Sequence, residues 1–248
     1  GQIISAKLIL ERPPAMASAA GAAAGADERP EALLVRRCNR ELEGSGARLL
    51  GCVRVINSFC AYRRCESRMY EYLLPAYVLR VGSEELATPL AAEPADAALA
   101  ARRASGASPL TEAEAAALEA ALHEMMGTHS FHNFTDSSKD KGTGKGAQEP
   151  YNTRYILKAE LGAPVELDGT LYIRLCYHGQ AFLLHQIRRM TSIAIAVARS
   201  SLKVGAAVAP DLIRQAFKRP FMSPRIVLSP AAPLVLRRCF YDSYERKA

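Results

Sequence analysis

The sequence has no apolar run that could cross a membrane as a helix. A spanning helix needs roughly 20 consecutive apolar residues, and the longest weakly polar stretch, Thr191 to Ala198, is much shorter. The first residues, Gly1 to Lys7, also lack the charged leader and apolar block of a secretory signal. Because an initiator Met is lacking too, we expect a processed or truncated piece, so the missing leader excludes little.

Metal-binding and disulfide patterns are also lacking. None of the cysteines forms a C-x-x-C pair, and no Cys/His grouping has zinc-finger spacing. This pattern predicts reduced, buried thiols in an intracellular protein, with no metal site. The cysteines are Cys38, Cys52, Cys60, Cys65, Cys176 and Cys239.

Basic residues outnumber acidic ones, 32 to 25. The 248 residues carry a formal net charge of +7, and 49% of them are hydrophobic, enough for one large core or two small ones. A basic surplus favours a polyanionic partner, because phosphate neutralisation releases counterions. Arginine pairs are scattered along the chain, which predicts a positive face assembled by folding. They are Arg36-Arg37, Arg63-Arg64, Arg188-Arg189 and Arg237-Arg238.

Hydrophobic periodicity predicts an α+β fold with an antiparallel or mixed sheet and packed helices. We expect strands at 3–10, 48–59, 68–80, 153–160, 170–178 and 234–240. We expect helices at 33–42, 111–126, 182–199 and 211–218. Residues 13–30 read as a low-complexity insertion, 82–108 as a loop, and 139–149 as a mobile basic loop with Lys139, Lys141 and Lys145.

Two of the expected helices carry specific signals. Thr111-x-x-Glu114 is a capping box, and a stripe of Leu118, Leu122 and Met125 follows it. In the 182–199 segment, one face is apolar at helical spacing and should be buried. The opposite face should carry His185, Arg188, Arg189 and Ser192.

Three blocks, in order along the chain, resemble the TruA/Pus1-type pseudouridine synthases, and more closely the eukaryotic Pus1-like branch. Residues 65–75, CESRMYEYLLP, are similar to the family's C-D-S-R-T-Y-E-Y-L-L-P. Residues 127–135, GTHSFHNFT, are similar to its G-T-H-N-F-H-N-F-T. Residues 179–190, GQAFLLHQIRRM, are similar to its G-Q-S-F-x-x-H-Q-I-R-K-M. Three long ordered matches are far more specific than one short motif.

The sequence departs from the family at the catalytic aspartate. In the family, a G-R-T-D-K-G-V-H-A-A loop carries this Asp and precedes a strand that begins G-Q-V-V-S, which Gly1 to Ser5 resembles. No R-T-D occurs in the 248 residues. We therefore expect this piece to lack the Asp and to be inactive alone, and the full-length protein to carry it. Tyr62 also stands where the family has Arg, whose charge Arg63 or Arg64 could replace.

The resemblance implies two halves and a basic RNA-binding cleft. Residues 1–64 would be the remainder of a ferredoxin-like N-terminal half, and 65–248 the C-terminal catalytic half. The implied activity is isomerisation of uridine to pseudouridine in a structured RNA, most naturally tRNA, with rRNA and small nuclear RNA as other substrates. The implied enzyme uses no cofactor and no metal, acts in the nucleus or mitochondrion, or in the cytosol, and is a monomer or homodimer.

Two residues match catalytic positions of the family. Tyr70 matches the tyrosine that stacks on the flipped uracil and helps to remove the C5 proton, roles that suit a flat phenol. Arg188 matches the arginine that pairs with the catalytic Asp, because an adjacent cation keeps a carboxylate ionised. The RNA-binding candidates are Arg68, His132, Asn133, His185, Gln186, Arg189, Arg63 and Arg64, while Phe131 and Phe134 are expected in the core.

Two other hypotheses remain at this point. A fold of this kind that had lost its Asp could serve as a non-catalytic RNA-binding scaffold, for example in ribosome assembly. An unrelated basic α+β domain could match the blocks by chance, although their order argues against it.

Overall fold

The computed structural model describes residues 29–79, 104, 108–135, 149–204, 210–220, 222 and 224–246. These residues separate into two units that divide between Arg64 and Cys65. The predicted strand at 3–10, nearly all of the insertion at 13–30, and the lysines of the basic loop lie outside the described residues. The two units are described separately below.

The first unit contains α1 (Pro30–Glu41) and α2 (Ala61–Arg64). The predicted helix at 33–42 is confirmed, and it starts earlier because Pro30 suits the first turn of a helix. The predicted strand at 48–59 is wrong, since these residues form no strand. A strand needs a neighbour for its backbone groups, and within the described residues none pairs with this segment. The side-chain amide of Asn39 instead bonds both the N–H and the C=O of Leu49, at 2.7 and 2.9 Å.

The second unit is built on a five-stranded sheet, which confirms the α+β fold. The strand order is β2-β3-β4-β1-β5, and every neighbouring pair is antiparallel. The strands are β1 (Ser67–Pro75), β2 (Gly127–Ser130), β3 (Thr153–Leu167), β4 (Thr170–Gly179) and β5 (Leu234–Phe240). Four of the expected strands are therefore confirmed, and the β5 bounds agree with the sequence.

Two strand ends differ from expectation for local reasons. β1 stops at Pro75, which has no N–H for a sheet ladder, and η1 (Ala76–Leu79) follows as a 3-10 turn. β3 continues to Leu167 because a two-residue turn joins it to β4. Asp168 and Gly169 occupy that turn with φ of 47° and 80°, the positive values that such a hairpin requires.

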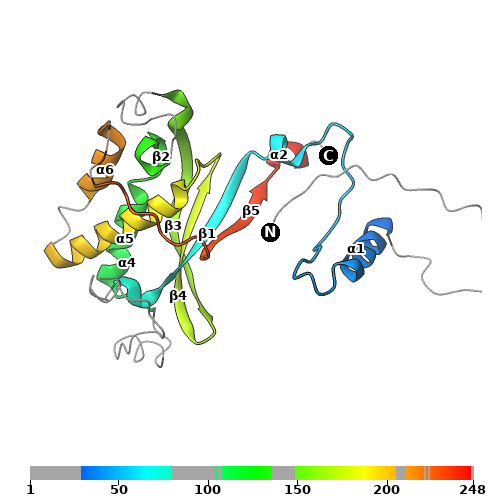
Figure 1. Ribbon diagram of the computed structural model, residues 1–248, viewed down its shortest axis with the longest axis horizontal. Coiled ribbons are helices and arrows are strands. Elements are labelled where there is room, and N and C mark those ends of the chain that lie inside the picture. Colours follow the sequence, from blue (N-terminus) through cyan, green and yellow to red (C-terminus); the bar gives the residue numbers. More distant parts are fainter. Residues whose placement is uncertain are drawn as a thin grey trace, which may run out of the picture. The chain divides into compact units, whose positions relative to one another are not determined.

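Three helices lie on one side of this sheet, and the third of them packs on the other two (Figure 1). They are α4 (Glu112–His123), α5 (Gln186–Val204) and α6 (Pro210–Lys218). The capping box of α4 is confirmed: Thr111 Oγ1 accepts from the N–H of Glu114, and the Glu114 carboxylate accepts from the N–H of Thr111. Short elements complete the unit, namely η3 (His132–Phe134), η5 (Pro150–Asn152) and α7 (Asp242–Glu245).

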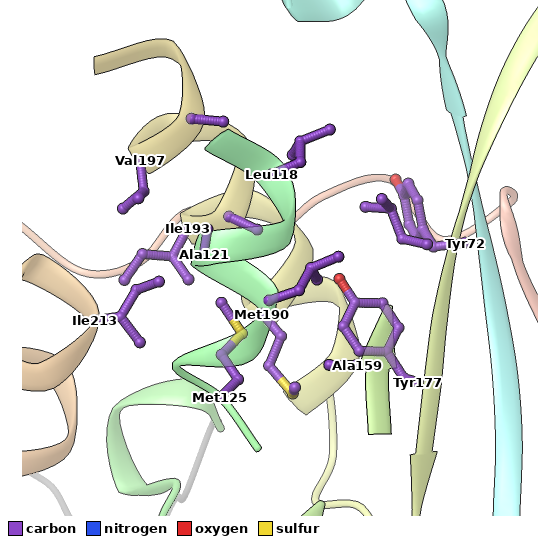
Figure 2. Packing of buried hydrophobic residues seen from close by; sticks show 14 of the residues in the cluster. Tyr72, Leu118, Ala121, Met125, Ala159, Tyr177, Met190, Ile193, Val197 and Ile213 are labelled. Carbon is purple, nitrogen blue, oxygen red and sulfur yellow. The ribbon is translucent and has the colours of Figure 1, made fainter. Parts of the chain in front are cut away.

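The core lies between the sheet and the helices (Figure 2). Alternate residues of β4, including Ile173, Leu175 and Tyr177, are buried toward α4 and α5, as their period of two predicted. The expected stripe of α4 is buried too, as are Phe131 and Phe134. This packing fixes α5 against the sheet, in which β1 carries Tyr70 and Tyr72.

Some expectations about burial are wrong. Arg189 was expected on the polar face of its helix, yet its side chain is buried. Each of the six cysteines, expected to be buried, is partly exposed. Across the described ranges, no helix has both the length and the apolar character needed to span a membrane.

Candidate active site

Tyr70 lies in the middle of β1 and is half-buried. Its ring meets the ring of Phe182 edge to face, with centroids 5.3 Å apart and planes at 84°. Burial raises the pKa of the Tyr70 phenol above its usual value, and the charge of Arg68 opposes this only in part. Tyr70 is therefore a neutral phenol near pH 7, which suits stacking on a base better than removing a proton.

Arg188 lies in the first turn of α5 and is half-buried. Its Nε–H donates to the backbone carbonyl oxygen of Ser229 at 2.6 Å. Its Nη1 lies 3.4 Å from Nδ1 of His185, whose backbone has a positive φ of 62°. These contacts hold the guanidinium by its Nε edge and leave N–H groups of its outer edge for an anion.

Tyr72 links the two residues. It lies two positions after Tyr70, so both side chains leave β1 on the same side. The Tyr72 hydroxyl donates to the carbonyl oxygen of Pro230 at 3.1 Å. Burial raises the pKa of Tyr72, while a hydrogen bond with Ser229 and the positive charge of Arg188 lower it. Tyr72 therefore lies within electrostatic range of Arg188, and Tyr70 lies two residues before Tyr72 on the same side of β1.

Arg68 is a third member of this site. It precedes Tyr70 by two residues, and its Nη1 donates to the carbonyl oxygen of Gln180 at 3.1 Å. Gln180 directly follows β4, at the start of the segment that leads to α5. Arg68 thus ties β1 to this segment, and it is only partly exposed.

Two predicted RNA contacts of α5 are interior residues. Gln186 is fully buried, and its Oε1 accepts from the N–H of Leu183 at 2.7 Å, which fixes the start of the helix. The Arg189 side chain is 7% exposed, and its Nη1 donates to the carbonyl oxygen of Ile226 at 2.5 Å. In this structure both residues support the helix that carries Arg188.

His132 and Asn133 bond to the C-terminal end of α6. His132 Nε2 lies 2.8 Å from the carbonyl oxygen of Arg219, and Asn133 Nδ2 donates to the carbonyl oxygen of Ala216, also at 2.8 Å. Carbonyls at the end of a helix need such partners. Arg63 and Arg64 lie on α2 in the first unit, where both are exposed.

Sequence reasoning missed two contributors to the site. No sequence pattern indicates that Ser229 contacts Arg188, because Ser229 belongs to an irregular segment far along the chain from α5. Phe182 was part of a matching block, but nothing in its spacing indicated contact with Tyr70. Within the described ranges, no cluster of His, Cys, Asp or Glu could hold a metal ion.

Comparison with known proteins agrees with this geometry. Residues 121–242 match the family model described as tRNA pseudouridine synthase. This match includes Arg188, Ser192 and Ser229, and it ends two residues after β5.

Individual relatives extend the similarity. The tRNA pseudouridine(27/28) synthase of Saccharomyces cerevisiae is 38% identical over 133 residues, which cover 53% of this chain and 30% of that protein. The tRNA pseudouridine synthase 1 of Yarrowia lipolytica is 36% identical over 121 residues, covering 49% of this chain and 20% of that protein. The pseudouridylate synthase 1 homolog of Homo sapiens is 26% identical over 205 residues, covering 82% of this chain and 40% of that protein.

The chain spans less than half the length of these curated relatives. The family match includes β4, α5 and Ser229 but begins after β1, and the human relative aligns over most of the chain. The segment from residue 121 to residue 242 therefore belongs to the TruA/Pus1-type pseudouridine synthases.

Proposed function

We propose that the protein containing this chain isomerises uridine to pseudouridine in tRNA. The observation that supports this proposal most directly is that the charge of Arg188, whose guanidinium is held by Ser229, acts on Tyr72 of β1, two residues after Tyr70, whose phenol stands beside Phe182. The family match and the names of the relatives support the same reaction.

The reaction is an internal rearrangement of one nucleotide. The bond between C1′ and N1 breaks, the uracil turns, and C1′ bonds to C5. The C5 proton is lost and N1 gains a proton, so no atom is added and no electrons are exchanged. The target base must first leave its stack, at a cost of about a few kcal/mol, and enter a pocket.

Arg188 would anchor the carboxylate that attacks the sugar or starts its elimination. A guanidinium keeps such a carboxylate ionised and aims it through paired hydrogen bonds. Within the described residues, no carboxylate is hydrogen-bonded or ion-paired to Arg188. The sequence contains no R-T-D, so we propose that the Asp lies outside these 248 residues.

Tyr70 would stack on the flipped uracil. Its ring is partly exposed and is fixed from the side by Phe182. Aromatic stacking accepts a base without reading its edge, so the pocket relies on other groups to recognise uracil. Arg68 and His185 would line this pocket.

Exposed arginines of the first unit, among them Arg63 and Arg64, would meet RNA phosphates. The net charge of the chain supports such contacts. Because the proposed substrate is RNA, the same proposal has the enzyme act inside the cell, in the nucleus, mitochondrion or cytosol.

The complete gene product, incubated with tRNA carrying tritium at C5 of uridine, tests the proposal. Formation of pseudouridine releases that tritium to water, and Arg188→Ala should abolish the release. Arg214→Ala is the matched control, because Arg214 is an exposed arginine of α6 paired with Glu124. Binding of tRNA without tritium release by the unaltered protein would contradict the proposal and favour an RNA-binding scaffold.

A further inference from the structure

One irregular segment holds both arginines of α5. This segment, residues 226–230, is named here the arginine strap. Its carbonyl at Ile226 accepts from Arg189, and its carbonyl at Ser229 accepts from Arg188. Its carbonyl at Pro230 accepts from the hydroxyl of Tyr72 on β1. The arginine strap therefore connects the first turn of α5 with the strand that carries Tyr70.

Three hydroxyl groups cross-link the same region. The hydroxyl oxygens of Ser192 and Ser229 lie 2.5 Å apart, and the Ser229 side chain also acts on the Tyr72 phenol, whose pKa it lowers. Counting protons fixes the direction, since each hydroxyl has one hydrogen to donate. Tyr72 donates to the Pro230 carbonyl, so a bond between Ser229 and Tyr72 has Ser229 as its donor, and Ser192 then donates to Ser229. The result is one chain of hydrogen bonds from α5 to β1 that passes through the residue whose carbonyl holds Arg188.

We propose that the hydroxyl of Tyr72 is a positioning group for Arg188, a role that rests on the proposed function. The Tyr72 hydroxyl fixes Pro230 by donating and Ser229 by accepting. It thereby sets the position of the Ser229 carbonyl, which holds the Nε edge of the guanidinium. Without that hydroxyl, Arg188 keeps its charge, but its guanidinium is no longer held in the same position. A small misplacement of a catalytic group slows a reaction strongly.

Tyr177 provides a matched comparison. Its ring is buried on the same side of the sheet, on the neighbouring strand β4 (Figure 2). Its hydroxyl bonds the side chain of Thr191 on α5 at 3.0 Å. Each tyrosine thus joins the sheet to its surroundings through one buried hydroxyl, but only Tyr72 bonds the arginine strap. A general structural role would make the two hydroxyls equivalent.

The test compares Tyr72→Phe with Tyr177→Phe in the complete gene product acting on tRNA. Both changes remove one hydroxyl and leave the ring. We expect Tyr72→Phe to lower kcat by about tenfold or more with little change in KM or tRNA affinity, because an interaction of the transition state is lost. Tyr177→Phe should keep kcat while lowering the melting temperature. Equal losses of kcat in the two variants would overturn the proposal.

Ser192→Ala supplies a second route to the same conclusion. If Ser192 and Tyr72 act through Ser229, the double variant should lose no more activity than the more damaged single variant, because groups acting as one unit are not additive. Losses that multiply would mean that the two hydroxyls act independently, and would overturn the hydrogen-bond chain.

A measurement without catalysis separates this proposal from the proposed function. The Nε–H proton of Arg188 should exchange slowly with water while it bonds the Ser229 carbonyl, and its NMR signal is assigned by its absence in Arg188→Lys. Exchange should be faster in Tyr72→Phe than in Tyr177→Phe. If the unaltered protein makes no pseudouridine, the proposed function fails, yet this comparison still applies: unequal exchange supports the coupling and equal exchange overturns it.

Discussion

Arg188 and Ser229 are 41 positions apart in the sequence, and the Nε–H of the first donates to the backbone carbonyl oxygen of the second at 2.6 Å. An arginine can make this bond through Nε–H and a second contact through its Nη groups. A lysine ammonium cannot make both in the same fixed geometry. The side chain can hold the protein at Nε and still offer N–H groups of its outer edge to a carboxylate.

Arg188→Lys should therefore be nearly as harmful as Arg188→Ala. An ammonium group keeps the charge but cannot bond Ser229 and a carboxylate in the same fixed geometry, so we expect a loss of about 100-fold or more in kcat/KM. Single-turnover release of tritium from labelled tRNA measures this loss. Arg214→Lys, at an exposed position of α6, is the control. Near-normal activity of Arg188→Lys would show that charge alone suffices.

Substitutions of Tyr70 decide between its two proposed roles. If the ring stacks on uracil, Tyr70→Phe should stay active, whereas Tyr70→Ala should lose about 1–3 kcal/mol of stacking energy with the base. Both variants can be assayed for kcat and KM on the same tRNA. If Phe proves as inactive as Ala, the hydroxyl itself takes part in the chemistry.

Gly179→Ala should disturb the start of the segment that leads to α5. A Cβ at Gly179 would lie 2.9 Å from Phe182 Cζ, 3.1 Å from Ile156 Cδ1 and 3.2 Å from the Tyr155 carbonyl oxygen. Because the carbonyl oxygen is backbone and cannot turn aside, we expect a loss of about 1–3 kcal/mol in the free energy of unfolding.

Gly51→Ala is the control for that change, since a Cβ at Gly51 meets nothing within 4 Å. Urea unfolding of both variants gives the two free energies. Phe182 also packs on Tyr70, so Gly179→Ala should lower activity even under conditions where it remains folded. A Gly179→Ala protein as stable and active as the unaltered one would contradict this packing.

Alkaline pH should destabilise the protein. Burial raises the pKa of Tyr70, Tyr72 and Tyr177, and it raises the pKa of Tyr241 from 10.0 to about 12. The unfolded chain loses these protons first, so it binds fewer protons than the native state above pH 10.0. The contribution of these phenols to the free energy of unfolding is therefore fully present below that pH and is lost as pH rises toward about 12.

Urea unfolding from neutral pH to about pH 11, followed together with phenolate absorbance, measures this loss. Tyr177→Phe removes one of the buried phenols, so its free energy of unfolding should fall less steeply with pH. A free energy that stays constant over this range would contradict the raised pKa values.

The elements with local signals were predictable from the sequence. The alternation in β4 and the capping box of α4 predicted both elements because each signal describes contacts within a few residues. The strand predicted at 48–59 has β-type residues but no pairing partner among the described residues, and pairing is what a strand requires.

The exposure of Arg189 was not predictable in this way. Helical spacing placed it on a polar face, and that face is covered by residues 226–230, which follow the helix at a distance that no periodicity reveals. Tyr70 and Arg188 came from the resemblance, whereas their supports, Ser229 and Phe182, required the three-dimensional arrangement.

Both neighbouring arginines of α5 donate to backbone carbonyls of residues 226–230. A substitution there that displaces one of these backbone carbonyls would be scored as a loss of enzyme function in a mutational scan, even where the protein still accumulates normally. In a map of tolerance to substitution, such positions would be as sensitive as the reactive groups, although they act through the backbone. Attempts to shorten or graft this loop for engineering should therefore begin by preserving its three accepting carbonyls.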